Sequence, residues 1–303
     1  MDCRAPHEAA MRPRAAILLA SFNGENWIRD QVDSVLSQRG VDVQLFISDD
    51  GSTDATQAIL GDLAANDARV HWAPNPHPLG YAAANFYHMI CTLDLGNFDY
   101  VAFADQDDIW LPGKLARQVS QLIAHGADGT SSDVIAFWSS GRVFYLKKSF
   151  PQRRYDYIFE SPGPGCTMLM TSRLLSRMRE LLADRASLAS TVSFHDWLAY
   201  AVTRSSGWKW HIADQPTLLY RQHQANEFGA NYGVDGVCRR FDRYISGKYA
   251  RDCQAILGVA IDCAKAAGGD IPSISVLDIL LHGRRRLVHR ILMTMMLPRG
   301  LGI

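Results

Sequence analysis

Ala15-Ala-Ile-Leu-Leu-Ala20, followed at once by Ser21-Phe-Asn-Gly24, is the stretch from which the fold of this chain can be worked out. Six apolar residues in a row that end at a polar turn are typical of a strand buried on both faces of a sheet. A helical pattern follows over residues 27–36, and Gly40 is its expected end. The stretch therefore predicts a buried strand, a tight turn and a helix, in that order.

The same order repeats along the next part of the chain. Further strands are expected over residues 43–47, 69–73 and 99–104, with helices over 55–65 and 81–93. Alternating strands and helices imply a parallel, doubly wound sheet with right-handed crossovers. Because such sheets bind their ligands outside the carboxyl ends of the strands, the polar segments after each strand are candidate site residues.

The remainder of the chain has a more mixed pattern. A strand pair is expected over 134–145, a helix over 194–202, extended segments over 208–220, and helices from about residue 238 onward. The predicted fold class is α/β: a Rossmann-like, mostly parallel sheet flanked by helices, with a C-terminal helical extension.

The composition narrows the class of protein. With 48% hydrophobic and 20% charged residues, the 303-residue chain can build a core and is not a disordered tail. Thirty-one basic residues balance 31 acidic ones, which argues against broad nucleic-acid binding. The six cysteines form no CxxC pair, so we expect reduced thiols in a cytoplasmic protein. We expect no signal peptide, and no apolar run reaches the ~18 residues that a membrane span needs.

The acidic segment Asp105-Gln-Asp-Asp108 directly follows a predicted strand. Three carboxylates within four residues repel each other unless a cation lies among them, and a hard divalent ion shared with substrate phosphates would fit. Asp105 and Asp107 alternate along the chain and can share one side. The alternative interpretation is a solvated acidic turn.

A second acidic segment, Asp49-Asp-Gly-Ser-Thr-Asp54, ends another predicted strand. A turn with Ser52 or Thr53 capping the next helix explains part of it. Asp50 could in addition accept hydrogen bonds from a base or a ribose. Since the chain contains neither GxxxxGK nor GxGxxG, any nucleotide would be held by carboxylates and a metal.

Two further segments carry candidate chemistry. His195-Asp-Trp197 opens a predicted helix, where Asp196 is either a charge favoured by the helix dipole or a general base. Arg221-Gln-His223 offers one cation and one imidazole that could bind a metal, although a lone histidine is usually no ligand.

Taken together, these segments resemble the family 2 glycosyltransferases with the GT-A fold, and most of all the bacterial rhamnosyltransferase-like subgroup. The resemblance covers residues 14–231 and rests on six segments in the family's order. They are Ser21–Glu25, Asp49–Asp54, Phe103–Trp110 with Lys114, Gly165–Thr167, His195–Trp197 and Arg221–His223. The QxxRW motif of processive members is missing, which argues against a polymerising synthase.

The resemblance implies a role for each matching residue. Phe22, Asn23, Glu25, Asp50, Asp105 and Arg221 would bind the donor nucleotide sugar; Asp107 and His223 would bind Mg²⁺ or Mn²⁺; Asp196 would be the catalytic base; Gly165, Cys166, His195 and Trp197 would lie on the acceptor side.

The implied reaction is an inverting, metal-dependent sugar transfer in one displacement, with an oxocarbenium-like transition state. The donor would be a nucleoside-diphosphate sugar, with dTDP-rhamnose suggested by similarity, and the acceptor a growing cell-surface polysaccharide such as O-antigen or a lipid-linked glycan. A magnesium-dependent phosphohydrolase and a non-catalytic carbohydrate-binding or scaffold protein are the alternatives.

We divide the chain into a flexible N-terminus (1–13), a GT-A domain (14–231) and a C-terminal helical region (232–303). In the last, Leu287, Ile291 and Met295 form one helical stripe with Val288, Leu292 and Met296 beside it, and Arg284, Arg285, Arg286 and Arg290 are expected on the other side. We favour packing of these helices on the domain or on another subunit, with a solvated basic face. Peripheral contact with the inner face of a membrane is the alternative. The oligomeric state stays open.

Overall fold

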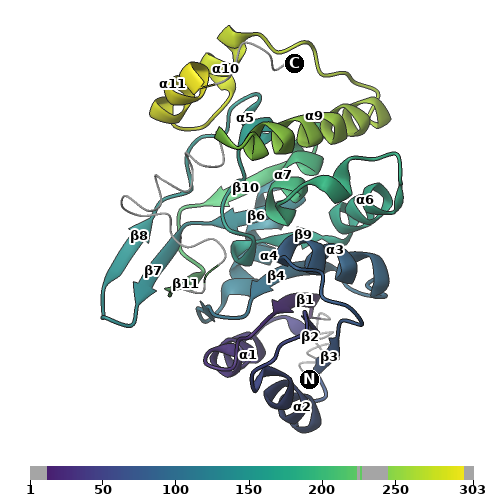
Figure 1. Cartoon of the computed structure of the whole chain (residues 1–303), viewed down its shortest axis with the longest axis vertical. Coiled ribbons are helices and arrows are strands. Elements are labelled where there is room, and N and C mark those ends of the chain that lie inside the picture. The colour runs from purple at the N-terminus through teal and green to yellow at the C-terminus, as the bar shows by residue number, and fades with distance from the viewer. Residues whose placement is uncertain (1–11, 224–225, 227–244, 297–303) are drawn as a thin grey trace, which may run out of the picture.

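Two sheets organise the chain. The computed structural model describes residues 12–223, 226 and 245–296, which Figure 1 draws in colour. Within them a seven-stranded sheet has the order β10-β6-β9-β4-β1-β2-β3, and a four-stranded sheet the order β5-β11-β7-β8. The N-terminal segment predicted to be flexible lies outside the described residues except for Arg12 and Pro13.

The strands of the large sheet are β1 (Arg14–Ser21), β2 (Asp42–Asp49), β3 (Val70–Pro74), β4 (Tyr100–Asp105), β6 (Gly129–Ser132), β9 (Leu169–Thr171) and β10 (Trp210–Ala213). Those of the small sheet are β5 (Ile109–Trp110), β7 (Val134–Trp138), β8 (Val143–Leu146) and β11 (Leu218–Gln222). β1 pairs in parallel with β2 and β4, and β2 with β3, as predicted, whereas β9 runs antiparallel to both β4 and β6.

The register of the parallel strands sets the position of the site. Ser21 lies opposite Asp49, and Ala20 opposite Asp105, so β1, β2 and β4 end at one edge. The loops that follow them are therefore neighbours although they are far apart in sequence.

The longer helices are α1 (Ile28–Leu36), α2 (Thr56–Asn66), α3 (Ala82–Thr92), α4 (Lys114–His125), α6 (Ser172–Ala183), α7 (His195–Ser205), α9 (Lys248–Ala266) and α11 (Leu287–Met296). Shorter ones are α5 (Asp156–Phe159), η1 (Gly165–Thr167), η2 (Ala189–Thr191) and α10 (Val276–His282). Helix α1 ends at Leu36 rather than at Gly40, which follows it in a left-handed turn (φ 81°).

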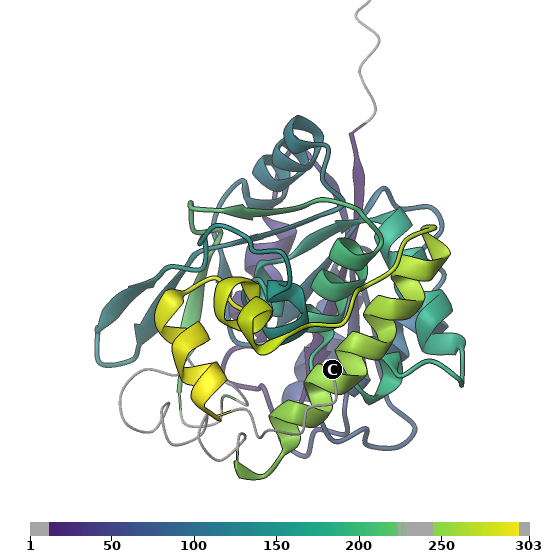
Figure 2. The same ribbon diagram turned by 90° about the horizontal axis from the view of Figure 1, so that it is seen from above.

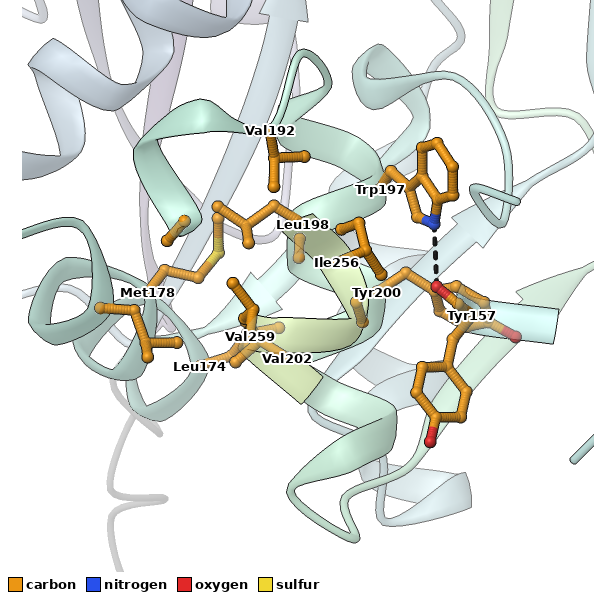
Figure 3. Close-up of a cluster of buried hydrophobic side chains, with 14 of the residues drawn as sticks. Tyr157, Leu174, Met178, Val192, Trp197, Leu198, Tyr200, Val202, Ile256 and Val259 are labelled. Atoms are coloured by element: carbon orange, nitrogen blue, oxygen red, sulfur yellow. Dashed lines mark hydrogen bonds between the residues drawn. The ribbon is translucent and has the colours of Figure 1, made fainter. Parts of the chain in front are cut away.

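Both faces of the large sheet are covered, which explains the unbroken apolar run of β1. Ile17 and Leu19 belong to a core with α1, α2 and α4, whereas Ala16 and Leu18 belong to a core with α3, α6, α7 and α9. Figure 3 shows the second core, in which Leu198 and Val202 of α7 lie beside Ile256 and Val259 of α9. The C-terminal helix α9 thus shares the core of the sheet domain.

The arrangement of the last two helices corrects the sequence prediction. Leu287, Val288 and Ile291 of α11 are exposed, whereas Arg285 and Arg290 are buried. The expected basic face is therefore not solvated as a whole, because two of its arginines turn inward. In Figures 1 and 2 these helices form the yellow end of the molecule. No helix among the described residues is long and apolar enough to cross a membrane.

Arg285 turns inward because the fold supplies acceptors for its whole guanidinium group. Nε donates to Glu160 Oε1 (3.1 Å), Nη1 to the carbonyl of Pro162 (3.1 Å) and Nη2 to the carbonyl of Ser161. Asp156, fully buried, lies 3.9 Å away. Although burial opposes it, the positive charge of Arg285 lowers the pKa of Glu160.

Replacing Arg285 with alanine should reduce the free energy of unfolding by about 3 kcal/mol, because it leaves one fully buried and one half-buried carboxylate short of a partner. Chemical denaturation at pH 7.5 measures the loss. Arg286→Ala, the exposed neighbour, is the matched control and should change stability by less than about 0.5 kcal/mol. Equal stability of the two variants would show that the buried network contributes nothing.

Candidate active site

A cleft of about 720 Å³ lies at the common edge of β1, β2 and β4. Its lining includes eight of the predicted site residues: Phe22, Asp50, Asp105, Asp107, Gly165, His195, Asp196 and Trp197. Five others, Asn23, Glu25, Cys166, Arg221 and His223, lie outside this lining. The structure thus brings carboxylates from three separate parts of the chain to one cleft.

The two adjacent aspartates after β2 have different surroundings. Asp49 is fully buried and accepts hydrogen bonds from Ser21, Ser52 and Gln57, so it organises the turn. Asp50 lines the cleft, and its carboxylate accepts the backbone N–H groups of residues 79 and 80 (2.6 and 2.8 Å). Oδ1 also accepts Asn75 Nδ2 (3.1 Å), whereas Oδ2 has a single donor and keeps a lone pair for a ligand, because a carboxylate oxygen can accept two hydrogen bonds.

Asn23 and Glu25 connect the loops after β1 and β2. Asn23, in a left-handed conformation (φ 49°), accepts the backbone N–H of Thr53 through Oδ1 (2.9 Å). Glu25 accepts the N–H of Ala55, at the start of α2, through Oε2 (2.8 Å). Both side chains therefore hold together the loops that border the cleft, without lining the cleft themselves.

Gln106 holds Phe22 at the cleft. Its side-chain amide makes two bonds of 2.9 Å with the backbone N–H and carbonyl of Phe22, and it occupies the space that a Cβ at Gly24 would need. Phe22, which is 53% exposed, is thus presented at the cleft on a fixed backbone.

The structure brings Asp107 and His223 together, although 116 residues separate them. His223 Nε2 lies 2.8 Å from Asp107 Oδ2, and Asn226 Nδ2 donates to the same oxygen (2.9 Å). The imidazole of His223 stacks on the indole of Trp27, with ring centroids 3.8 Å apart and planes 11° apart. Trp27, which the sequence analysis did not assign to the site, and Asn226, expected there only as part of a polar loop, fix the orientation of this pair.

Arg221 holds the end of β11 against the acidic loop. Its Nε donates to the carbonyl of Asp107 (2.8 Å), its backbone N–H to Asp108 (3.2 Å), and its Nη2 to Asp30 of α1 (3.1 Å). Since Arg221 lies outside the cleft lining, its contacts place the loop rather than reach into the cleft.

A cluster of one half-buried and two fully buried residues lies at the acidic loop. Asp105, Asp108 and Cys166 bring their polar atoms within 4.8 Å of one another. Burial, and then the charges of Asp107 and Asp105, raise the pKa of Asp108 well above its usual range; burial and the same kind of repulsion raise that of the Cys166 thiol. A protonated thiol is a poor ligand for a hard cation, so Asp108 and Cys166 support the loop, whereas Asp105 also lines the cleft.

Lys114 belongs to the same buried layer. It is fully buried, donates to Gln118 (2.9 Å) and lies over the ring of Trp110 (4.5 Å). Burial lowers its pKa to about 7. It does not line the cleft, which is where a phosphohydrolase would need its lysine.

The donor set at Asp107 fits a divalent metal. A carboxylate oxygen and an imidazole nitrogen already lie 2.8 Å apart, and a third carboxylate, Asp105, lines the same cleft. Oxygen donors suit Mg²⁺ and Mn²⁺, and the imidazole favours Mn²⁺ of the two. Asp107 and His223, with Asp105 nearby, are the residues that could hold such an ion.

Because Trp27 orients the imidazole of His223, Trp27→Ala should weaken Mn²⁺ binding about tenfold, the effect typical of groups that orient a metal ligand. Titration of Mn²⁺ into the protein measures the affinity. Trp27→Phe keeps an aromatic face and should restore most of it. Wild-type affinity in the alanine variant would show that the stack has no part in metal binding.

Asp196 lies at the first turn of α7 and lines the cleft. Oδ2 accepts the hydroxyl of Ser161 (2.9 Å) and Oδ1 the backbone N–H of Trp197 (2.7 Å), so the carboxylate has a fixed orientation. Burial raises its pKa to about 6. A carboxylate that is ionised at neutral pH yet holds a proton at mild acidity is suited to general-base chemistry.

The residues on either side of Asp196 form one wall of the cleft. His195 lies between Phe86 and Phe103, and burial lowers its pKa to about 3, so its imidazole is neutral. A Cβ at Gly165 would overlap His195 Nε2, which explains the glycine. Trp197 is a core residue whose Nε1 donates to the carbonyl of Tyr157 (2.8 Å; Figure 3).

Cationic side chains, which the sequence analysis did not assign to the site, line the remaining part of the cleft. They are Lys147, Lys148, Arg284, Arg285 and Arg286. The dibasic pair and the arginine run were visible in the sequence, but nothing in their spacing indicated that they meet.

Comparisons with known proteins agree with this geometry. Residues 16–179 match the family model described as glycosyl transferase family 2. The chain is 35% identical over 245 residues to dTDP-rhamnosyl transferase RfbG of Shigella flexneri, covering 80% of this chain and 85% of that protein.

Two solved structures resemble the fold. The structure of S. aureus TarS 1–349 with UDP-GlcNAc has a TM-score of 0.55 at 14% identity, over 91% of this chain and 69% of that one. Mannosyltransferase PcManGT of Pyrobaculum calidifontis with GDP-Man and Mn²⁺ has a TM-score of 0.51 at 16% identity, over 94% and 88%.

Proposed function

Since the chain belongs to glycosyltransferase family 2 and has the GT-A fold, we propose that it moves L-rhamnose from dTDP-rhamnose to a cell-surface polysaccharide or lipid-linked glycan, such as O-antigen. The similarity to RfbG supports the choice of donor. The single observation that carries the proposed chemistry is that Asp50, Asp105, Asp107 and Asp196 line one cleft. Family membership makes the chain a glycosyltransferase, which sets the phosphohydrolase and the scaffold protein aside.

On this proposal the donor lies against the loops after β1, β2 and β4. Phe22 packs against the nucleotide, Asp50 accepts hydrogen bonds from the base or ribose, and Asp105 contacts the donor sugar. Asn23, Glu25 and Arg221 contribute by holding these loops. A bound Mn²⁺ or Mg²⁺, held by Asp107 and His223, would neutralise the charge of the leaving diphosphate.

Asp196 acts on the acceptor side. Its carboxylate takes the proton of the acceptor hydroxyl while that oxygen attacks the anomeric carbon and the bond to the diphosphate breaks. One displacement inverts the configuration, so no covalent intermediate with the enzyme is needed. Gly165, His195 and Trp197 line the wall along which the acceptor lies, and Cys166 supports this wall from the interior.

We also propose peripheral contact with the cytoplasmic face of a membrane. Six apolar side chains of α10 and α11 are exposed: Val276, Leu277, Leu281, Leu287, Val288 and Ile291. Exposed arginine lies among them at position 286, as expected for a helical pair that meets an anionic surface.

Thermal stabilisation by nucleotide sugars tests the proposed donor. A donor at 100 times its Kd should stabilise the fold by about 2.7 kcal/mol, which raises the melting temperature. We expect dTDP-rhamnose with Mn²⁺ to give a larger shift than UDP-GlcNAc, GDP-mannose or dTDP-rhamnose with EDTA. If another nucleotide sugar gives the larger shift, that sugar rather than dTDP-rhamnose is the donor. If none of them shifts the melting temperature, the proposal is contradicted.

A further inference from the structure

The cleft has a basic end that the proposed reaction leaves unused. We define the basic end as Lys147, Lys148, Arg284 and Arg286, which line the cleft together with Phe150. We propose that it binds a phosphate or diphosphate group carried by the acceptor. This inference rests on the proposed function, because it assigns a ligand to the acceptor side of the same cleft.

Two cations of the basic end face the cleft and, within the described part of the chain, have no acidic partner. Lys147 and Arg286 are exposed and lie on the ring of Phe150, 5.5 and 5.3 Å from its centroid. Among the residues that the structure describes, neither forms an ion pair. Their charge is therefore available to an anion.

The nearby carboxylates form their ion pairs with arginines outside the basic end, although the positive charge of Arg284 also acts on Glu160. Glu160 pairs with Arg285 (3.1 Å), and Asp156 with Arg204 (3.0 Å). Arg284 donates to neutral acceptors, the carbonyl of Phe159 and the hydroxyl of Tyr249, each at 2.9 Å. A chain without net charge thus concentrates positive charge at one end of its cleft.

The basic end adjoins the proposed base. Ser161 donates its hydroxyl to Asp196 and accepts Arg285 at its carbonyl, which links the base to the arginine run. Burial raises the pKa of Asp196, and the positive charge of Lys148 partly offsets that rise, so Lys148 acts on the proposed base. An anion bound here is therefore on the acceptor side, whereas the donor diphosphate belongs with Asp105 and Asp107 on the loop after β4.

The surface beside the basic end is apolar, which indicates an amphiphilic acceptor. Arg284, Arg285 and Arg286 form the link between α10 and α11, and the six exposed apolar side chains named above lie on these two helices. Figure 2 shows the two helices, in yellow, side by side. A sugar linked through a diphosphate to a lipid would place sugar, phosphates and chain along base, basic end and apolar helices in that order.

Binding of decyl diphosphate tests the inference directly. Calorimetric titration is done in EDTA, which prevents a metal from drawing the probe to the donor side. The wild-type protein should bind decyl diphosphate with an affinity that falls with salt, and decanol much more weakly. The double variant Lys147→Glu/Arg286→Glu should bind the probe at least about tenfold more weakly, since two charge-assisted contacts are reversed.

A charge-matched control separates local from overall electrostatics. Arg39 and Lys209 are exposed and lie outside the cleft lining, so Arg39→Glu/Lys209→Glu should bind the probe as the wild type does. All three proteins should keep the same melting-temperature shift with dTDP-rhamnose and Mn²⁺. A failure of the donor proposal would appear in that shift, independently of decyl diphosphate.

Vesicles distinguish an acceptor diphosphate from a lipid headgroup. If Lys147→Glu/Arg286→Glu loses binding to phosphatidylglycerol vesicles but keeps its affinity for decyl diphosphate, the basic end is a headgroup site and the inference is overturned. It is also overturned if the wild type does not bind decyl diphosphate, or binds decanol equally well.

Discussion

Replacing Asp196 with asparagine is expected to slow sugar transfer by about 10²- to 10⁴-fold, the range that a general base contributes. Asparagine has nearly the same shape and can still accept one of the two hydrogen bonds that orient the carboxylate, but it cannot take the acceptor proton. Donor binding should be unchanged, because Asp196 lies on the other side of the reacting carbon in the proposed arrangement. Initial rates of dTDP release with a saturating acceptor measure the effect.

The pH dependence of the wild-type enzyme follows from the same residue. Burial raises the pKa of Asp196 to about 6, so the proposed base would be protonated and inactive below that pH. The wild-type kcat/KM should therefore rise through a midpoint near pH 6 and level off above it. The asparagine variant should lack this rise, and a variant that keeps both the rate and the rise would exclude Asp196 as the base.

Stability measurements separate loss of chemistry from loss of fold. A carboxyl group whose pKa is higher in the folded chain than in the unfolded chain favours folding at low pH and opposes it once ionised. Above about pH 6 the charge of Asp196 thus lowers the free energy of unfolding. Asp196→Asn should be at least as stable as the wild type at pH 7.5. A variant that is inactive because it does not fold would therefore be recognised by its lower free energy of unfolding.

Replacing Asp107 with alanine should abolish metal-dependent transfer, with Mn²⁺ affinity falling at least about 100-fold. The substitution removes the oxygen that contacts both His223 and Asn226, and with it the carboxylate that the metal would share with the diphosphate. His223→Ala should weaken binding less, because the carboxylates remain. Mn²⁺ titration with dTDP and transfer rates across a range of Mn²⁺ concentrations measure both variants.

Asp62→Ala is the matched control for the loss of one aspartate. Asp62 is exposed on α2 and pairs with Arg29 at the surface, a contact worth about 0–1 kcal/mol. It should leave Mn²⁺ affinity and transfer unchanged. If Asp107→Ala keeps the metal dependence of the wild type, Asp107 is not part of the proposed metal site.

The sheet was predictable because its signal is local. The apolar run of β1 is buried on both faces, and each predicted strand of the first half is present within a residue or two of its expected bounds. The pairing of β9 was not predictable, since a three-residue strand carries no periodicity of its own and takes its direction from β4 and β6.

The candidate site was predictable only in part, for a related reason. Strand ends place Asp50, Asp105 and Asp107 together by topology alone. The inward turn of Arg285 depends on carbonyl groups of a loop more than 120 residues away. Hydrophobic periodicity shows only which residues of one helix share a face, so it does not report such a distant contact. Nor could spacing show that Asp108 faces the interior while Asp107 faces the cleft.

The last structural elements have a consequence for hybrid enzymes. Tyr249 stacks on Trp197, and Arg284, Arg285 and Arg286 line the cleft, so the tail is built into the catalytic half. A chimera that takes residues up to 231 from one relative and the tail from another would have to pack core side chains from two different proteins against each other. Successful chimeras should instead exchange the loop around residues 147–162 and the tail as one matched cassette.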